Sequence, residues 1–430
     1  IARYLKKAPL DGESRPIIIG YDTRLLSDQY AQELAGVLET NGIPSYVSNK
    51  PVITPALSLA TANLKARLGI MVTASHNPPQ YNGIKLKASY GGPVCQEVIA
   101  GIEASLPDES PPVIAQSHNT ACINLDSIYL AAVGKQINRQ AIFQSGLTVV
   151  VDAMHGAGVG YLDTLLEECG IKVIRIRDKI DPDFGGTNPE PIAQNLEPLR
   201  VAVEQYQADL GLATDGDGDR IGVVDHTGQY VDAQQVFLLL LTHLVMNKGK
   251  SGVVARTVST SSLVDTVAAH FGLVVRETPI GFKYITALCR AESVLLGGEE
   301  SGGFGFPWHL LDRDGVMAGL ILVEYISQME TPLRVLLDDL LEQFGPSVYR
   351  RLDFPLPPDF SISLLEPPLR LGQRVVTQIK TLDGLKLCLG EDGWVLIRAS
   401  GTEPMLRVYA EARSKSLLEE IIQEGTQWVQ

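Results

Sequence analysis

The chain has 430 residues, of which 45% are hydrophobic, and its 36 basic and 50 acidic residues give a net charge of −14 at pH 7. This length exceeds one ordinary domain core and predicts about three or more domains. The acidic balance excludes nucleic acid as a steady partner, because no basic domain stands out to neutralise phosphates. A small anionic substrate would need a local basic pocket. No apolar run approaches the ~18 residues of a membrane span.

Cysteine usage indicates a reducing, cytoplasmic setting. The five cysteines are odd in number, scattered and without a CxxC spacing, which predicts neither disulfides nor a zinc site. The chain begins at Ile1 rather than Met, so we expect an upstream segment, which could carry a targeting peptide.

Three stretches of the chain share one plan: a β-rich apolar run, a polar loop, a helical pattern that ends at Gly, and a second apolar run. They span residues 16–47, 147–176 and 252–275. The helical patterns end near Gly42, Gly170 and Gly272, and Gly is the expected residue just beyond a helix. This internal repeat predicts three similar α/β domains.

Further along each repeat, another apolar run leads into a loop with reactive side chains. Residues 69–72 precede the serine loop (73–78), residues 210–213 precede the acidic loop (214–220), and residues 294–296 precede the glutamate loop (297–303). Ligands of open α/β sheets bind beyond the carboxyl ends of the strands, so we expect the three loops to meet at one central cleft.

The serine loop reads Thr-Ala-Ser-His-Asn-Pro and places Ser75 beside His76. A hydrolase triad needs its histidine across the cleft, and the chain has no GxSxG elbow. A serine that carries phosphate is instead consistent with a metal loop nearby, because phosphoserine adds about 1.5 to 2 negative charges.

The acidic loop, Asp-Gly-Asp-Gly-Asp-Arg after Thr214, alternates three carboxylates with glycine between two strand-like runs. If the segment is extended, Asp215, Asp217 and Asp219 point to one side, and such crowding requires a cation. An EF-hand is excluded, because its sixth and twelfth positions would be Arg220 and His226 rather than Gly and Glu. Oxygen ligands with an open position favour Mg²⁺.

Two later loops complete the set. Glu299 and Ser301, flanked by glycines, offer hydroxyl-binding acceptors. The arginine loop (398–402), followed by Arg407, combines guanidinium groups, two hydroxyls and a glycine whose backbone can lie close to a ligand. This combination of groups is typical of a phosphate-binding site. The members of the loop are Arg398, Ser400, Gly401 and Thr402. The composition becomes rich in Pro from about residue 345, which predicts a smaller C-terminal α+β domain. We therefore expect domains at residues 1–138, 139–246, 247–344 and 345–430.

These four loops, in this order, resemble the α-D-phosphohexomutase superfamily, whose members move phosphate between C1 and C6 of a hexose. The resemblance spans residues 22–407. It implies three α/β domains and a smaller fourth one around a central cleft, with Ser75 as the phosphorylated residue. It also implies Ser75 and the three aspartates as Mg²⁺ ligands, Glu299 and Ser301 as sugar ligands, and the arginine loop with Arg407 as the phosphate site.

The resemblance further implies a mechanism. Phospho-Ser75, its charge held by Mg²⁺, Arg24 and Lys85, would give its phosphoryl group to a hexose monophosphate, and the hexose bisphosphate would turn over before back-transfer. Arg220 would hold the acidic loop or the phosphoserine. Lys283 is a candidate general acid or base together with Lys85 or His76, and the sequence does not rank them.

The Glu-Glu-Ser-Gly form of the glutamate loop looks more like phosphoglucomutases than phosphomannomutases or phosphoglucosamine mutases. We therefore expect interconversion of glucose 1-phosphate and glucose 6-phosphate through glucose 1,6-bisphosphate, by a monomer or homodimer. Mannose or glucosamine phosphates remain alternatives, as do a silent sugar-phosphate sensor and a Mg²⁺-dependent phosphatase. The family's N-terminal glycine and arginine motif would precede Ile1.

Overall fold

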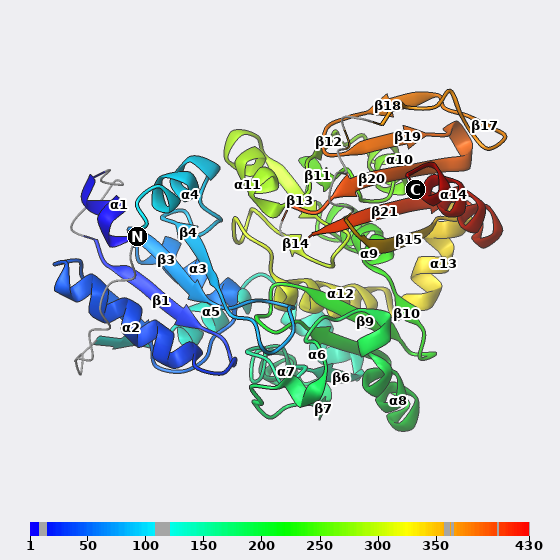
Figure 1. Ribbon diagram of the computed structural model, residues 1–430. Helices are drawn as coiled ribbons and strands as arrows, with labels where there is room; N and C mark the ends of the chain where they lie inside the picture. Colours follow the sequence, from blue (N-terminus) through cyan, green and yellow to red (C-terminus); the bar gives the residue numbers. More distant parts are fainter. Residues whose placement is uncertain (8–14, 108–120, 357–361, 363–364, 402–403, 430) are drawn as a thin grey trace.

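The computed structural model describes the chain except residues 8–14, 108–120, 357–361, 363–364, 402–403 and 430. Within the described residues, four main sheets define four consecutive units, which we number I to IV (Figure 1). No helix among the described residues is both long and apolar enough to cross a membrane.

Unit I has a five-stranded sheet in the order β4-β3-β1-β2-β5. Its strands are β1 (Ile17–Tyr21), β2 (Ser45–Ser48), β3 (Leu68–Val72), β4 (Ile84–Ala88) and β5 (Ala121–Ile123). Its helices are α1 (Ala2–Lys7), α2 (Ser27–Thr40), α3 (Thr54–Asn63), α4 (Gln96–Glu103) and α5 (Asp126–Val133).

Unit II has the order β10-β9-β8-β6-β7. Its strands are β6 (Thr148–Asp152), β7 (Lys172–Ile176), β8 (Leu210–Thr214), β9 (Ile221–Asp225) and β10 (Tyr230–Val231), and its helices are α6 (Arg139–Ser145), α7 (Leu162–Glu168) and α8 (Glu197–Tyr206). Two 3₁₀ turns, Phe184–Gly186 and Ala193–Asn195, lie between β7 and α8.

Unit III has the order β12-β11-β13-β14. Its strands are β11 (Val253–Thr257), β12 (Val275–Thr278), β13 (Val294–Gly298) and β14 (Phe304–Gly305). Its helices are α9 (Ala233–Met246), α10 (Leu263–His270), α11 (Phe282–Ala291), α12 (Gly315–Met329) and α13 (Leu333–Phe344).

The repeat predicted from the sequence is confirmed by strand order and direction. In each of the three sheets an antiparallel strand (β4, β9 or β14) pairs with a loop-bearing strand (β3, β8 or β13), which lies parallel to the first strand of the unit (β1, β6 or β11). The loop-bearing strands are buried along their whole length. Continuous burial explains their unbroken apolar sequences, because both faces of the sheet are covered.

Units II and III share one apolar core rather than packing as separate bodies. Helix α12 is buried along most of its length and contacts α6, α7, β8 and β9 of unit II as well as α9 and β14 of unit III. The largest hydrophobic cluster accordingly joins Leu212 and Val223 of unit II to Leu296 and Leu320 of unit III. The acidic and glutamate loops are therefore held on a common base.

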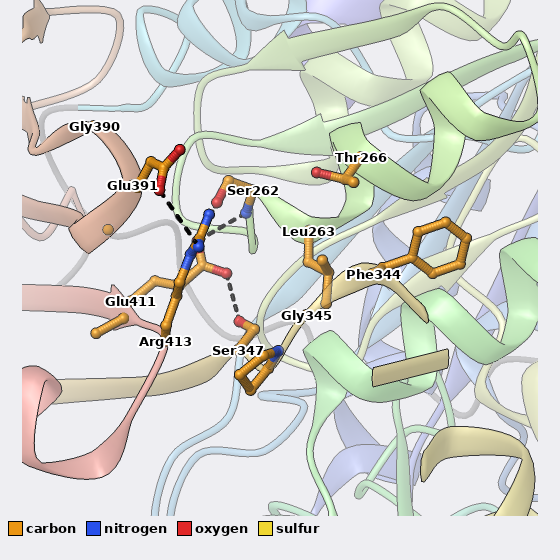
Figure 2. Close-up of a pocket in the computed structure, with 13 residues that line it drawn as sticks. Ser262, Leu263, Thr266, Phe344, Gly345, Ser347, Gly390, Glu391, Glu411 and Arg413 are labelled. Carbon is orange, nitrogen blue, oxygen red and sulfur yellow. Dashed lines mark hydrogen bonds and ion pairs between the residues drawn. The ribbon is translucent and has the colours of Figure 1, made fainter. Parts of the chain in front are cut away.

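Unit IV is an antiparallel sheet in the order β15-β21-β20-β19-β18, covered by α14 (Lys415–Val429). Its strands are β15 (Val348–Pro355), β18 (Gln378–Lys380), β19 (Leu385–Cys388), β20 (Gly393–Ala399) and β21 (Met405–Ala412), with a separate pair, β16 (Arg370–Leu371) and β17 (Arg374–Val375). The linker begins at Gly345, with φ of +97°. Figure 2 shows a pocket at this junction, lined by residues of α10, the linker and β21.

Candidate active site

The acidic loop joins β8 to β9 as a tight turn, not as the extended run considered from the sequence. The turn nevertheless gathers the three predicted carboxylates: Asp215, Asp217 and Asp219 are fully buried, and each offers an oxygen within 4.8 Å of the others. Gly218 makes this possible, because it adopts a φ of +73° and donates its N–H to the carbonyl of Asp215 at 3.1 Å.

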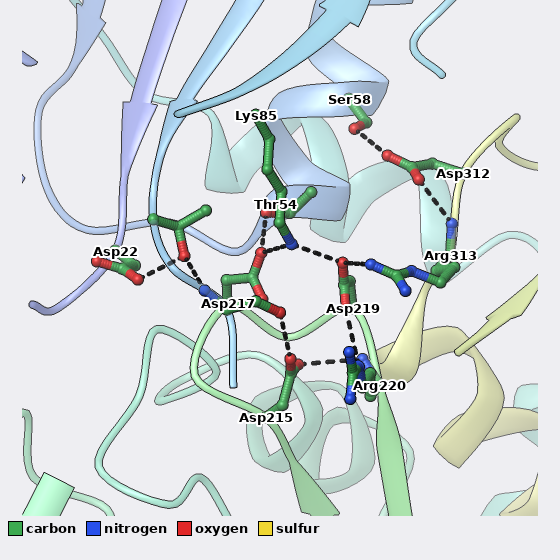
Figure 3. A network of polar contacts seen from close by, with 12 residues as sticks. Asp22, Thr54, Ser58, Lys85, Asp215, Asp217, Asp219, Arg220, Asp312 and Arg313 are labelled. Atoms are coloured by element: carbon green, nitrogen blue, oxygen red, sulfur yellow. Dashed lines mark hydrogen bonds and ion pairs between the residues drawn. The ribbon is translucent and has the colours of Figure 1, made fainter. Parts of the chain in front are cut away.

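Two cations from outside unit II compensate the carboxylates (Figure 3). Lys85 Nζ of β4 lies 2.6 Å from Asp217 Oδ2 and 2.9 Å from Asp219 Oδ2. Arg313 Nη2, just before α12, lies 2.6 Å from Asp219 Oδ2. Burial alone would raise the pKa of Asp219, but Arg313 and Lys85 hold it far below its ordinary value.

The pKa of Asp215 shifts in the opposite direction from that of Asp219. Burial, followed by the charges of Asp217 and Asp219, raises the pKa of Asp215 well above its ordinary value. For Lys85, burial disfavours the charged form, but the same two neighbours outweigh it and raise the pKa. The negative charge of Asp215 is therefore less fully compensated by neighbouring cations than the charge of Asp219.

The donor set fits a hard divalent cation. Asp217 Oδ1 and Asp219 Oδ1 are buried and have no hydrogen-bond partner in the described part of the chain. Buried carboxylate oxygens without partners are costly, and oxygen ligands are those that Mg²⁺ prefers. Asp215, Asp217 and Asp219 are thus the residues that would hold the ion.

Ser75 reaches this cluster from unit I. Its Oγ donates to Asp215 Oδ2 at 3.0 Å, and its N–H donates to Thr73 Oγ1 at 2.8 Å. Its φ of +55° is unusual for a residue other than glycine and holds the side chain at the acidic loop. Gly216 allows the two loops to touch, because a Cβ there would lie 2.5 Å from the Ser75 carbonyl oxygen.

Arg24 occupies a different place from the one expected of a phosphoryl-binding cation. Its Nε donates to Asp22 Oδ2 at 3.1 Å, and its Nη atoms donate to carbonyl oxygens of the serine loop and the residues after it. The four carbonyls belong to Ser75, Asn77, Pro78 and Tyr81, at 2.7 to 3.0 Å. All five guanidinium N–H groups are therefore engaged, and Arg24 shapes the serine loop.

His76 and Arg220 flank the cluster. Burial, then the charges of Arg220 and Lys85, lower the pKa of His76 well below its ordinary value, so its imidazole is neutral. The backbone N–H of Arg220 donates to Asp215 Oδ1 at 3.1 Å, and its Nη1 lies 3.4 Å from Glu190 Oε1. These contacts place Arg220 beside the acidic loop, and its role in holding that loop or the phosphoserine stays a prediction.

The glutamate loop connects to the acidic loop through Arg313. Glu299 is buried, and its Oε2 accepts from Arg313 Nη1 at 3.0 Å while its Oε1 accepts from Gly281 N at 3.1 Å. Burial raises the pKa of Glu299 although Arg313 opposes the shift. Ser301 is half-buried in the same loop. Arg313 was not predicted, and its only sequence signal is an Asp-Arg-Asp-Gly run before an apolar helix.

The predicted arginine loop and Arg407 lie in unit IV. Arg398 and Arg407 are directly opposite each other on β20 and β21, and each pairs with an aspartate of its own unit. Ser400 donates its N–H to the Met405 carbonyl at 2.8 Å, and Gly401 is exposed. Thr402 lies outside the described residues.

Lys283 is not part of the metal cluster. It lies on α11 of unit III, where its Nζ donates to Gln96 Oε1 of α4 in unit I at 2.7 Å. The structure therefore brings Ser75, His76, Lys85 and Arg220 together with the three aspartates, and it places Lys283 at a contact between units I and III.

Family models match most of the chain. Those of phosphoglucomutase/phosphomannomutase domains I, II and III, described as alpha/beta/alpha, match residues 1–112, 127–228 and 232–344, and that of the C-terminal domain matches residues 377–425. A phosphoglucomutase/phosphomannomutase of Thermococcus kodakarensis is 32% identical over 96% of this chain and 90% of its own length. The chain belongs to this family.

Membership in the phosphoglucomutase/phosphomannomutase family makes the protein a phosphohexomutase, an isomerase. Relatives differ in the sugar that their names state. A probable phosphoglucosamine mutase of Methanopyrus kandleri is 31% identical over 95% of this chain and 88% of its own length. The crystal structure of a putative phosphomannomutase from Thermus thermophilus has a TM-score of 0.88 at 34% identity and covers 100% of this chain and 92% of its own.

Arg24→Lys should loosen the serine loop, because lysine supplies three donors without the planar fork and leaves buried carbonyls unpaired. We expect a loss of about 2 to 3 kcal/mol in the free energy of unfolding and faster amide exchange at residues 75–81. Denaturant unfolding and hydrogen-exchange mass spectrometry measure both. Arg200→Lys, at a surface ion pair on α8, is the control, and equal behaviour of the two variants would contradict the assignment.

Lys85→Met should tighten divalent-metal binding, because it removes the ammonium that competes for Asp217 and Asp219 while it keeps the length of the side chain. We expect the Mn²⁺ dissociation constant of the dephosphorylated protein to fall about tenfold, equivalent to about 1.4 kcal/mol. Isothermal titration calorimetry measures it, with Lys283→Met as a control outside the cluster. Unchanged or weaker binding in Lys85→Met would show that the ammonium does not compete.

Proposed function

We propose that this phosphohexomutase interconverts glucose 1-phosphate and glucose 6-phosphate through a phosphorylated Ser75 and a glucose 1,6-bisphosphate intermediate. The observation that carries the proposal is the hydrogen bond from Ser75 Oγ to Asp215, which joins the predicted phosphoserine to a buried three-aspartate cluster. Of the described residues, only this cluster groups three possible metal ligands.

Mg²⁺, bound by Asp215, Asp217 and Asp219, would neutralise charge on the transferring phosphoryl group. The chain's own residues do the remaining work. The P–O bond to Ser75 Oγ breaks, a P–O bond to a substrate hydroxyl forms, and the hydroxyl proton leaves to a base. The same steps in reverse regenerate the phosphoserine after the bisphosphate has turned over.

The charge states favour His76 among the candidate bases. Lys85 carries a raised pKa and is charged, so it is suited to stabilise the phosphoryl group rather than to accept a proton. Lys283 contacts Gln96 away from the cluster. His76 is neutral and adjacent to Ser75, and its buried Nδ1 has no hydrogen-bond partner among the described residues.

Arg24 serves the reaction indirectly in this proposal. It holds the carbonyls of the serine loop, and so it fixes the strained backbone that aims Ser75 at the acidic loop. Preorganised geometry of this kind is the main contribution that a protein makes to phosphoryl transfer. Arg220 fixes the acidic loop from the other side.

The hexose would lie between the glutamate and arginine loops. Glu299 and Ser301 would accept or donate to hydroxyls that lie similarly in both orientations of the sugar, while Arg398, Ser400, Gly401, Thr402 and Arg407 would hold the phosphate that is not reacting. The Glu-Glu-Ser-Gly sequence favours glucose. Mannose and glucosamine phosphates are the competing substrates, in keeping with the names of the relatives.

A silent sugar-phosphate sensor is the less favoured alternative, because Ser75, the three aspartates and Arg398 are all intact. The five cysteines are scattered along the chain without a CxxC spacing, and we propose a cytoplasmic setting for the enzyme on that basis.

A substrate panel tests the sugar assignment. Coupled assays with glucose 1-phosphate, mannose 1-phosphate and glucosamine 1-phosphate, each with traces of the matching bisphosphate, should give the highest kcat/KM for glucose 1-phosphate. Equal rates, or a higher rate with another sugar, would overturn the glucose assignment. Release of inorganic phosphate in place of glucose 6-phosphate would indicate a phosphatase.

Ser75→Ala should lower kcat by about 10³-fold or more, because it removes the atom that carries the phosphoryl group. Peptide mass spectrometry of the wild-type protein should locate phosphate on the peptide that contains Ser75. Ser416→Ala, at an exposed position of α14, serves as the control. Near-wild-type turnover of Ser75→Ala would refute the phosphoserine role.

A further inference from the structure

A buried carboxylate fastens unit IV to unit III at the pocket between them (Figure 2). Glu411 of β21 is only 3% exposed. It accepts hydrogen bonds from Ser262 N at 2.9 Å and Ser262 Oγ at 2.6 Å, and also from Ser261 Oγ, all at the start of α10 in unit III. From its own side it accepts from Ser347 Oγ at 2.6 Å and from Trp394 Nε1.

These five bonds keep the carboxylate charged. Burial acts against the charge, but the hydroxyl donors of Ser261, Ser262 and Ser347 outweigh it and lower the pKa of Glu411. Hydrogen bonds to an ionised acceptor are roughly twice as strong as those between neutral groups. Two units and the linker between them therefore meet at one charged side chain.

Beside the Glu411 cluster the two units also meet through an apolar cluster, and the directional polar contacts hold this apolar contact in register. Val258 and Ile280 of unit III pack against Trp394, Leu396 and Tyr409 of unit IV. Further polar links join the two units: Lys386 Nζ of β19 donates to the Val258 carbonyl at 2.6 Å, Ile280 N donates to Asp383 Oδ2 at 2.9 Å, and Lys380 Nζ lies 3.0 Å from Glu277 Oε2. Lys386 Nζ also lies 3.6 Å from the centre of the Trp394 ring. Apolar surfaces can slide, whereas directional hydrogen bonds cannot without breaking.

The two strands that carry this cluster also carry the arginine pair. Trp394 is opposite Glu411 on β20 and β21, and Arg398 is opposite Arg407 four residues along the same strands. Residues separated by four positions lie on the same face of a strand, about 13 Å apart. Glu411 thus helps to place the arginine pair relative to unit III, together with Asp383, which accepts from Ile280 N and pairs with Arg398.

The segment that holds Glu411 also holds the glutamate loop. Ser259 Oγ donates to Glu300 Oε2 at 2.6 Å, two residues before the serines that bind Glu411. Thr257 Oγ1 forms hydrogen bonds with Ser259 Oγ and Thr260 Oγ1, and all three residues are fully buried. One hydroxyl-rich segment, residues 257–262, therefore sets the positions of both the glutamate loop and unit IV.

We propose that Glu411 is a positioning residue for the mutase reaction. It holds the arginine loop at a fixed distance from the glutamate loop, so that the non-reacting phosphate and the sugar hydroxyls are bound together, and any turning of unit IV pivots about it. The proposal rests on the function proposed above, and it concerns how tightly the substrate and the bisphosphate are retained.

Glu411→Gln tests it, because glutamine keeps the shape but replaces one of the two acceptor oxygens with an NH₂ group, which then faces the two or three donors that bond to that oxygen. In the ligand-free protein we expect faster amide exchange in residues 259–263 and 393–399. With substrate, we expect KM for the hexose phosphate to rise about tenfold while kcat changes less than twofold. We also expect a stronger dependence on added bisphosphate, since the intermediate escapes more often. Glu419→Gln, at an exposed ion pair of α14, should resemble the wild type.

Unchanged exchange and unchanged KM in Glu411→Gln would overturn the proposal, as would a fall in kcat with KM unaltered. If Glu411→Gln does not fold, Ser262→Ala and Trp394→Phe remove single side-chain donors and should show the same shifts to a smaller degree. The exchange measurement needs no substrate. If the wild-type protein has no mutase activity, the proposed function fails while the exchange data still decide whether Glu411 fastens unit IV.

Discussion

The compensation of three buried carboxylates is the constraint on which the arrangement of the units depends. Two carboxylates ~4 Å apart repel by roughly 4 kcal/mol at an effective dielectric near 20, and unit II contributes three within 4.8 Å. The compensating side chains come from other units: Lys85 from unit I and Arg313 from unit III. Thr54 of unit I also donates to Asp217. The charge balance is therefore possible only when the three units are together.

The residues on either side of Arg313, Asp312 and Asp314, form further contacts between the units. Asp312 accepts from Ser58 Oγ at 2.8 Å and forms an ion pair with Lys87, both in unit I. Asp314 accepts from Tyr129 Oη of α5 at 2.7 Å and caps the N-terminus of α12. Asp312 and Asp314 thus tie unit I to the buried helix that units II and III share, and Arg313 between them binds Asp219 of unit II and Glu299 of unit III. Unit IV is joined to this base through Glu411 and the polar contacts beside it.

The sequence predicted the features that depend on local pattern. The repeated strands, the Gly-terminated helices and the carboxylate cluster follow from periodicity and spacing. The sequence did not predict the roles of Arg313 and Glu411, because these roles depend on how distant segments pack. Arg313 lies 94 residues beyond its partner Asp219, and Glu411 lies 149 residues beyond its partner Ser262. Arg24 shows the same limit, since an arginine after a strand suits either a phosphate or a loop of carbonyls, and only the fold decides.

We propose that the carboxylate cluster and Ser75 form one divalent-metal site. Anomalous diffraction from crystals of the dephosphorylated protein soaked in Mn²⁺ tests it most directly. We expect a single strong peak, bound by oxygens of Asp215, Asp217 and Asp219, next to Ser75 Oγ and with Lys85 displaced from between the aspartates. No peak at this position, or an ion bound elsewhere while Lys85 still bridges Asp217 and Asp219, would contradict it.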